Sequence, residues 1–214
     1  MRVMLNCAMS ADGKIALSTR RETEISNRDD KVRVHKLRNT VDAVLVGVGT
    51  ILADNPKLTV GEKYVKPTKQ PLRIVLDSNG RTPEKARVLD GSAKTLIVTN
   101  EYCTKTFRGA DVLRVGKWRV DLAAMVKKLE GMGVKTLLVE GGESVLWSFL
   151  KEGVADELSV FVGSMIIGGT GSPTLAGGEG FRSIDRVRRL KLLECRRLGD
   201  GALLRYEVIK NERR

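Results

Sequence analysis

The 214-residue chain has few of the residues that build several common kinds of site. Its three cysteines, Cys7, Cys103 and Cys195, are odd in number and far apart. This count argues against a disulfide framework and a cysteine-rich zinc site, and it favours a reducing compartment, so we expect a cytoplasmic protein. The single histidine, His35, argues against a histidine-dependent catalytic triad and a multi-histidine metal centre. No metal site is therefore expected.

Long apolar runs and clustered aromatic residues are also missing. The longest apolar runs, such as 43–46 and 74–76, have only the length of a strand, so we predict no membrane span. The first residues reach Asp12 without a long apolar region, which argues against a signal peptide. Aromatic residues make up 4% of the chain and are scattered, so we expect no stacking platform for single-stranded nucleic acid.

Positive charge is what the chain has in excess. Lysine and arginine total 38 against 26 acidic residues, which gives a net charge of +12. Such a balance suits nucleic acid or phosphorylated small molecules. Residues 186–191, which include Arg186, Arg188, Arg189 and Lys191, alternate basic and apolar side chains and are interpreted as the solvent face of a strand. We favour a phosphate-bearing small ligand, and a basic nucleic-acid-binding module is the alternative from another class.

The order of predicted elements indicates an α/β fold. Helices are expected at 29–40, 121–129 and about 143–151, and strands at 3–9, 43–46, 72–76, 95–99, 112–115, 136–139, 157–162, 187–195 and 202–209. The last two strands have no helix between them, and Gly199-Asp200-Gly201 predicts a hairpin turn there. We therefore expect one domain, 1–214, with a central, mostly parallel sheet, an antiparallel C-terminal hairpin and helices on both faces.

Four polar segments follow predicted strands. Residues 47–59, Gly-Val-Gly-Thr-Ile-Leu-Ala-Asp-Asn-Pro-Lys-Leu-Thr, are expected to form a loop in which glycines admit a ligand and Thr50 and Asp54 offer polar contacts. Residues 137–144 run through Gly141 and Gly142 into a helix whose N-terminus suits a pyrophosphate, although a plain helix start fits as well. Residues 76–83 form a polar turn, either a ligand site or simply a well-formed turn, and residues 8–14 open the first strand into a polar loop.

Together these segments resemble the riboflavin-pathway pyrimidine reductases. The resemblance is carried, in chain order, by Met-Ser-Ala-Asp-Gly-Lys at 9–14, Val-His-Lys-Leu-Arg at 34–38, the 47–59 segment, Arg-Ile-Val-Leu-Asp-Ser at 73–78 and Val-Glu-Gly-Gly at 139–142. It spans about residues 3–208. It implies a dihydrofolate-reductase-like fold, a single reductase domain, NADPH as the cofactor and a homodimer.

The resemblance also implies residue roles. Ala8 would contact the nicotinamide through its backbone, and Thr50 and Asp54 would hold the cofactor beside the substrate. Residues near the adenosine ribose and its 2′-phosphate would be Ser78, Asn79, Gly80 and Arg81, with Val115 beside the adenine. The pyrophosphate would be received by Gly141, Gly142, Glu143, Ser144 and Val145. The substrate would be lined by Arg38 and Leu58, with Thr23 or Ser26 near the ribose phosphate and Glu140 facing the sugar or pyrimidine. Purely structural roles remain open for three of these residues: Arg38 would also serve as a helix C-terminal cation, Leu58 as a core residue and Glu140 as a strand-end cap.

Two departures from the family pattern affect the substrate. Some bacterial relatives have an arginine where this chain has Gly61, so the phosphate would be held by other bases, for example Lys57, Lys14 or Arg28. Those relatives also carry a zinc deaminase with His-x-Glu and Pro-Cys-x-x-Cys segments, which this chain lacks. The favoured substrate is therefore 2,5-diamino-6-ribosylamino-4(3H)-pyrimidinone 5′-phosphate, reduced before deamination. The deaminated 5-amino-6-ribosylaminouracil 5′-phosphate is the alternative.

Because the sequence offers no metal and no histidine pair, catalysis would depend on positioning a hydride donor against an electrophilic carbon. The ribosylamine can open to an imine whose C1′ accepts hydride from NADPH, with the proton coming from water, Asp54 or Glu140. Dihydrofolate reductase is the competing enzyme on the same fold. It needs a carboxylate on an early helix to hold the pteridine, whereas the helix here offers His35 and Arg38.

Overall fold

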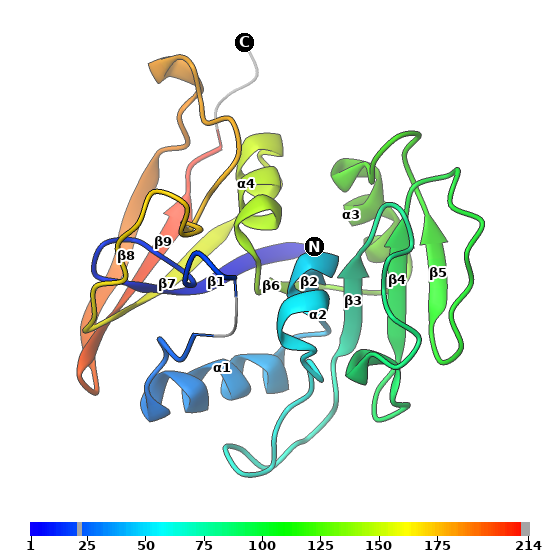
Figure 1. Ribbon diagram of the computed structural model, residues 1–214, viewed down its shortest axis with the longest axis horizontal. Coiled ribbons are helices and arrows are strands. Elements are labelled where there is room, and N and C mark those ends of the chain that lie inside the picture. Colours follow the sequence, from blue (N-terminus) through cyan, green and yellow to red (C-terminus); the bar gives the residue numbers. More distant parts are fainter. Residues whose placement is uncertain (21–22, 211–214) are drawn as a thin grey trace. The chain divides into compact units, whose positions relative to one another are not determined.

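A computed structural model of the chain describes residues 1–20 and 23–210 (Figure 1). Within them, nine strands and four α-helices alternate in the order expected of an α/β protein. In chain order they are β1 Arg2–Ser10, α1 Arg28–Thr40, β2 Ala43–Gly47, α2 Val48–Asp54, β3 Leu72–Leu76, β4 Thr95–Thr99, β5 Asp111–Arg114, α3 Leu122–Gly131, β6 Thr136–Val139, α4 Glu143–Glu152, β7 Glu157–Gly163, β8 Leu190–Leu198 and β9 Gly201–Val208. The α/β prediction is confirmed, and two short 3₁₀ helices, Arg87–Leu89 and Ile184–Arg186, complete the set.

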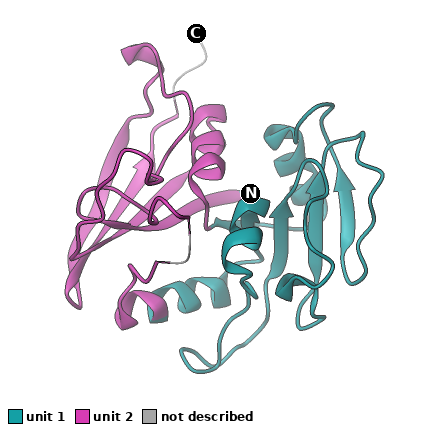
Figure 2. Cartoon of the chain, in the orientation of Figure 1, with its two compact units in different colours: residues 1, 32–139 teal, residues 2–31, 140–214 magenta. Residues whose placement is uncertain are grey.

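The chain divides into two compact units (Figure 2). Unit 1 comprises residue 1 and residues 32–139, and unit 2 comprises residues 2–31 and 140–214. Unit 1 is thus almost continuous in sequence, whereas unit 2 is assembled from the two ends of the chain. The boundary near residue 31 lies inside α1.

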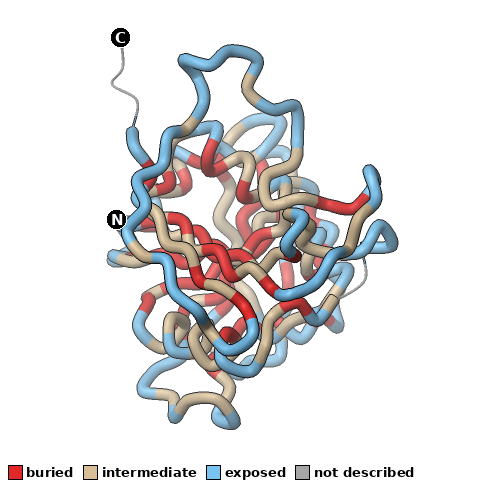
Figure 3. The backbone as a smooth tube through the Cα atoms, turned by 90° about the vertical axis from the view of Figure 1, so that its left-hand side faces the viewer, coloured by how far each residue is buried: buried red, intermediate tan, exposed pale blue. Residues whose placement is uncertain are grey.

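Unit 1 contains the strands β5-β4-β3-β2-β6, in that order, and all of them run parallel. Every residue of β2 and of β4 is buried, as expected for parallel strands that are covered on both faces. Figure 3 shows the buried stretches of the chain in the interior and the exposed stretches at the periphery. Because the strands are parallel, the residues that follow β2, β3, β4 and β5 emerge at the same edge of this unit.

Unit 2 contains the strands β1-β7-β9-β8. β1 and β7 are parallel, with Ala8 opposite Phe161, whereas β9 is antiparallel to both β7 and β8. The β8–β9 hairpin turns at Gly199 and Asp200, which confirms the antiparallel C-terminal hairpin. β8 is the edge strand, and most of its residues are exposed on both faces.

Side-chain caps begin two helices where the sequence places them. Asn27 Oδ1 accepts a hydrogen bond from the Asp30 N–H at the start of α1, and the Asp121 carboxylate accepts one from the Ala124 N–H at the start of α3. Such caps satisfy N–H groups that have no partner inside the helix. The helix starts are therefore well predicted by these polar residues.

Two local predictions are wrong. The first half of the segment expected as a loop is the helix α2, which buries Val48 and Ile51 and ends at Asn55 in the left-handed region. The basic stretch before β8 is not a regular strand face, because β8 begins only at Leu190. Arg188 instead donates to the carbonyl oxygens of Leu150 and Lys151, at the C-terminus of α4, where a cation is favourable.

One buried charge anchors unit 1. Arg73, at the start of β3, has no exposed surface, and its guanidinium donates to Thr95 Oγ1 at 3.0 Å, the Ala93 carbonyl at 2.7 Å and Asp90 Oδ1 at 2.8 Å. It also donates to the Lys57 carbonyl at 3.3 Å. A buried charge needs such partners, and here they tie the loop after α2 to the segment before β4.

Candidate active site

The turn after β3 is organised by the buried carboxylate of Asp77. Its Oδ2 accepts hydrogen bonds from the N–H and the hydroxyl of Thr82, each at 2.7 Å, which closes the turn. Its Oδ1 is also buried and has no hydrogen-bond partner among the described residues. Buried oxygens of this kind are rare in folded proteins, and a ligand hydroxyl or a water molecule is the natural donor for this one.

The predicted 2′-phosphate residues, Ser78 to Arg81, lie together in this turn. Ser78 Oγ accepts from the Val120 N–H at 3.3 Å, and the Gly80 carbonyl accepts from Lys105 Nζ at 2.6 Å. Gly80 has φ 66°, and a Cβ there would lie 2.9 Å from Cys103 Sγ, so the position requires glycine. The turn is therefore fixed on two sides while the Arg81 side chain stays exposed.

Val115, predicted beside the adenine, directly follows β5 and is 3% exposed. Its N–H donates to the Thr99 carbonyl at 3.0 Å. A side chain this buried offers little surface to a ligand, so it would contribute mainly through the backbone.

Thr50 and Asp54 lie one turn apart on α2, so they share a face of that helix. Both are partly exposed, whereas Val48 and Ile51 on the other side are buried. The two predicted polar contacts are thus presented by one rigid element of unit 1.

The loop after α2 carries Leu58, which is buried at 2% exposure and has φ 56°. Arg38, on α1, was predicted to line the substrate together with Leu58. Its Nη1 donates to the carbonyl oxygen of the next residue, Thr59, at 3.0 Å, so Arg38 holds this loop in place. The Leu58 side chain is a core residue in this structure, which is the structural alternative that the sequence left open. Its backbone conformation nevertheless shapes the loop.

His35 occupies the place next to Gly61. Its Nδ1 accepts from the Gly61 N–H at 2.9 Å, and its ring stacks on Tyr64 with centroids 4.4 Å apart. A Cβ at position 61 would lie 3.3 Å from the His35 ring. An arginine there would therefore press on the histidine, which gives the glycine of this chain a structural reason.

In unit 2, Glu140, Gly141 and Gly142 lead from β6 into α4. Gly141 is buried with φ 101°, a conformation that requires glycine, and the peptide bond between Gly141 and Gly142 is cis. Gly142 is the N-cap, and no side chain caps α4 there. The N-terminus of this ten-residue helix can therefore offer backbone N–H groups and the positive end of its dipole to an anion.

The carboxylate of Glu143 is engaged with other parts of unit 2. Oε1 pairs with Arg20 at 2.9 Å, and Oε2 accepts from the Thr174 N–H at 3.3 Å. This negative charge is thus balanced locally, and Glu143 and Ser144 would meet a pyrophosphate through their backbone N–H groups. The Val145 N–H, also predicted there, already donates to the Gly142 carbonyl at 3.0 Å.

Ala8 lies within β1, next to a thiol that is not reactive. Cys7 Sγ donates to the Ala8 carbonyl at 3.4 Å. Burial, with a smaller contribution from the Asp30 carboxylate, raises the pKa of Cys7 to about 12. The thiol therefore stays protonated and is no nucleophile at neutral pH.

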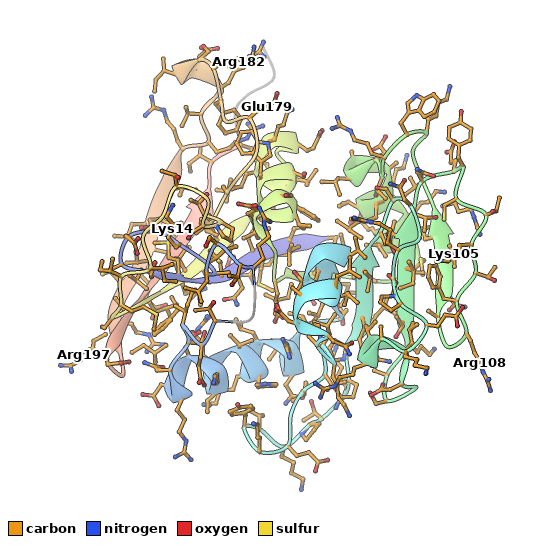
Figure 4. All side chains as sticks on the ribbon, in the orientation of Figure 1. Lys14, Lys105, Arg108, Glu179, Arg182 and Arg197 are labelled. Carbon is orange, nitrogen blue, oxygen red and sulfur yellow. The ribbon has the colours of Figure 1, made fainter. Side chains whose placement is uncertain are left out.

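The two side-chain hydroxyls predicted to lie near the ribose phosphate of the substrate already have hydrogen-bond partners in unit 2. Ser26 Oγ donates to Asp30 Oδ2 at 2.6 Å, and Thr23 Oγ1 accepts from the Leu17 N–H at 3.2 Å. Lys14 Nζ lies 3.4 Å from the Ser172 carbonyl, and Figure 4 shows Lys14 among the loops of this unit. Each group therefore has a structural role, and a ligand would have to share it with its present partner.

The predicted groups are thus divided between the units: those on α1, on α2 and in the turn after β3 belong to unit 1, and those on β1, at Thr23 and Ser26 and before α4 belong to unit 2. A search against family models matches residues 1–204 to the RibD C-terminal domain. The chain belongs to the RibD C-terminal domain family. The family predicted from the sequence motifs is confirmed.

Several relatives are similar to this RibD-type chain over most of its length. It is 40% identical to the 2,5-diamino-6-ribosylamino-4(3H)-pyrimidinone 5′-phosphate reductase of Methanothermobacter thermautotrophicus, with 96% of this chain and 97% of that protein covered. The protein of the same name from Archaeoglobus fulgidus is 36% identical, with 93% and 94% covered. The RibD protein of Actinobacillus pleuropneumoniae is 36% identical, but the chain spans 57% of its length.

Solved RibD structures share the fold. The structure of Acinetobacter baumannii RibD has a TM-score of 0.84 at 24% identity, over 97% of this chain and 58% of that one. The Thermotoga maritima deaminase/reductase has a TM-score of 0.83 at 27% identity, over 97% and 56%. The mostly parallel α/β fold predicted from sequence is therefore confirmed as that of RibD reductase domains.

Sequence reasoning missed several residues that shape this RibD-type site. Asp12 accepts from the N–H groups of Ile167 and Gly168, at 3.0 and 2.7 Å, and so joins two loops of unit 2. A hydrogen bond from Ser10, followed by these backbone bonds, lowers the pKa of Asp12 to about 2. Asp12 and Asp77 lie inside motifs that carried the resemblance, which was the available signal. Arg73 opens the 73–78 motif, so the same signal covered it, whereas no signal in the sequence pointed to Asn100, whose buried amide holds the loop after β4.

No helix of the described residues is long and apolar enough to cross a membrane. The same residues contain no group of three or more potential metal ligands.

Proposed function

We propose that the chain is the NADPH-dependent reductase that converts 2,5-diamino-6-ribosylamino-4(3H)-pyrimidinone 5′-phosphate to the ribitylamino product in riboflavin biosynthesis. The observation that carries this proposal is the 40% identity to a protein of that name over 97% of its length. A second such relative is covered over 94% of its length, whereas the RibD protein of Actinobacillus pleuropneumoniae is covered over 57%. The reductase domain of the proposal comprises both units.

Each unit offers groups that suit one part of a dinucleotide. The uncapped N-terminus of α4, reached through Gly141 and Gly142, suits a pyrophosphate, and the turn at Ser78–Arg81 offers a hydroxyl, an amide and a guanidinium for the ribose and its 2′-phosphate. The buried Asp77 Oδ1, which has no donor among the described residues, lies at the start of that turn. When bound, NADPH supplies a hydride. The Ala8 backbone, Thr50 and Asp54 would orient the nicotinamide.

The substrate is proposed to lie against Arg38, Glu140 and the backbone at Leu58, whose side chain is buried, with Thr23 or Ser26 near its phosphate. Arg38 already fixes the loop at Thr59, so it would hold both the loop and the ligand. Lys57 lies 3.4 Å from Asp90 and Lys14 near the Ser172 carbonyl, which leaves Arg28 as an exposed basic candidate at the start of α1. Asp54 or Glu140, or a water molecule, would deliver the proton that accompanies hydride transfer to C1′.

The substrate is tested directly by offering the purified protein NADPH with each ribosylamino pyrimidine phosphate. Loss of absorbance from the reduced nicotinamide reports turnover. We expect a large preference for the 2,5-diamino compound. A preference for the deaminated uracil compound would reverse the proposed order of reduction and deamination, and turnover of dihydrofolate with neither pyrimidine would identify a dihydrofolate reductase instead.

Two variants test the cofactor. Arg81→Ala should lower the preference for NADPH over NADH, because Arg81 would bind the 2′-phosphate that only NADPH carries. Gly142→Val should abolish cofactor binding in a folded protein, because a branched side chain would block the approach of a pyrophosphate. NADPH titration with circular dichroism as a fold control measures both, and unchanged affinity in either variant removes that residue from the site.

We also propose that the chain forms a homodimer through the edge strand β8. Leu190, Leu192 and Leu193 are 40%, 55% and 49% exposed, which is costly for an edge strand in water. A self-complementary contact would cover them. Light scattering tests this, and a monomer of 23.5 kDa would reject it. We further propose a cytoplasmic location, which the three free cysteines favour.

A further inference from the structure

Two aromatic side chains that are 16 positions apart in sequence meet on the surface of unit 1. Tyr102 follows β4 and Trp118 follows β5, and their rings lie 5.1 Å apart, centroid to centroid, with an angle of 41° between their planes. They are 60% and 82% exposed. Although the aromatic residues are scattered in the sequence, folding brings these two together.

The buried side chain of Asn100 holds the aromatic pair in place. Its Oδ1 accepts from the N–H groups of Tyr102 and Cys103, at 3.1 and 2.9 Å. Its Nδ2 donates to the Trp118 carbonyl at 3.2 Å and to Asn79 Oδ1 at 3.3 Å. Asn100 is 7% exposed, so one buried amide joins both aromatic loops to the turn at Ser78–Arg81.

Cationic side chains surround this pair. Lys105 reaches the turn directly, through its hydrogen bond to the Gly80 carbonyl, and Figure 4 shows it on the side of unit 1 formed by β4 and β5. Arg81, Lys117 and Arg119 are exposed on the same three loops. Within 77–83, 100–106 and 115–121, the acidic residues are Asp77, Glu101 and Asp121, against the four basic residues Arg81, Lys105, Lys117 and Arg119. Asp77 is buried in its turn and the Asp121 carboxylate is the cap of α3. The local charge is thus positive.

We infer that Tyr102 and Trp118 form a stacking surface for the adenine ring of the dinucleotide, while Arg81 and Lys105 bind its 2′-phosphate. This inference rests on the proposed function, because it assigns the adenosine end of the same cofactor. The position agrees with the general rule that ligands of parallel sheets bind beyond the carboxyl ends of the strands. An exposed aromatic face beside cations suits a base that carries a phosphate, because the ring stacks while the charges pair.

The size of the surface favours one nucleotide over a polynucleotide. The surface consists of only two rings, of which the indole of Trp118 is the more exposed, so it offers room to stack a single base. Single-strand binders instead place successive bases on several aromatic rings along a basic groove. Val115, at 3% exposure, cannot provide a comparable surface for adenine.

Fluorescence of Trp118 tests the inference without turnover. The chain has two tryptophans, so Trp147→Phe leaves Trp118 as the sole reporter, and Trp147 lies on α4, beside Phe181. We expect 2′,5′-ADP to quench this fluorescence to saturation, and 5′-ADP, which lacks the 2′-phosphate, to do so only at higher concentration. Ribose 5-phosphate, which lacks the base, should leave it unchanged. Quenching by a single-stranded oligonucleotide but not by 2′,5′-ADP would overturn the inference in favour of a nucleic-acid surface.

Affinity measurements on variants complete the test. Trp118→Ala should weaken binding of both 2′,5′-ADP and NADPH by about tenfold, the loss expected when one base–aromatic stack is removed, and Trp118→Phe should restore most of it. Trp147→Phe is the matched control and should bind as the parent does. If the parent binds and oxidises NADPH with substrate while Trp118→Ala binds NADPH equally well, the aromatic site is refuted and the proposed function stands. If the parent binds 2′,5′-ADP at Trp118 but reduces neither pyrimidine, the proposed function fails and the nucleotide site stands.

Discussion

Replacing the buried Arg73 by methionine should destabilise the protein strongly. The change keeps much of the side-chain volume but removes every donor, so the Asp90 carboxylate and the Ala93 carbonyl lose their partners at 2.8 and 2.7 Å. Breaking a buried ion pair by removing one member costs about 3–5 kcal/mol. The Asp90 side chain is 27% exposed and can be partly rehydrated, so the lower end, about 3 kcal/mol, applies. For a chain of this size that corresponds to a fall in Tm of about 6–12 °C.

The assay is thermal unfolding followed by circular dichroism, with Arg108→Met as the control. Arg108 is an exposed arginine in the same unit, and its replacement should change stability by no more than about 0.5 kcal/mol. The double variant Arg73→Met, Asp90→Asn should recover part of the loss, because it removes a charge that the single variant leaves without its buried cation and with only the half-exposed Lys57 at 3.4 Å. A Tm for Arg73→Met equal to that of Arg108→Met would refute the view that this network anchors unit 1.

Three further outcomes are expected. Hydrogen bonds from Lys69 and Thr136 lower the pKa of the Asp42 carboxylate to about 2, against the opposing effect of burial, so its contribution to stability is present above about pH 4 and is lost as the pH falls toward 2. Asp42→Asn should therefore make stability less dependent on pH in that window, and an acid-unfolding midpoint equal to that of the parent would contradict this. His35→Phe should keep the stacking on Tyr64 but remove the acceptor of the Gly61 N–H, so amide exchange at Gly61 should accelerate, and equal protection in both proteins would argue against that bond. In thiol titration of the native protein, the exposed Cys195 should react quickly, whereas the buried Cys7 should react only on unfolding; early reaction of both would show that β1 opens readily.

The sequence predicts the regular elements well because their signals are local. Apolar runs with turn residues at their ends mark the strands, and Asn27 and Asp121 mark two helix starts. α2 was missed because seven residues flanked by glycine and Asn-Pro carry too short a period to be distinguished from a loop. The start of β8 was placed three residues early because Arg188 binds the end of α4, a contact that no local pattern reveals.

The candidate site was predictable only where residues lie in contiguous motifs. The turn at Ser78–Arg81 and the glycines before α4 could be located in this way, and their ligand roles stay predictions. Asn100 could not be found, because its importance comes from hydrogen bonds to loops on either side of it that are separate in sequence. Contacts of this kind are fixed by strand order, which brings the ends of β3, β4 and β5 to one edge.

The assembly of unit 2 from both ends of the chain has a consequence for its synthesis on the ribosome. Among the described residues of its own unit, β1 has β7 as its neighbouring strand, and the Val3 N–H is bonded to Asp156, 153 residues later. At about 5–20 residues per second, roughly 8–30 s pass between the translation of these two segments. During that interval unit 1 can be completed, while the apolar β1 must be kept from aggregating. The last strands made, β8 and β9, then close the unit whose first strand was made before all the others.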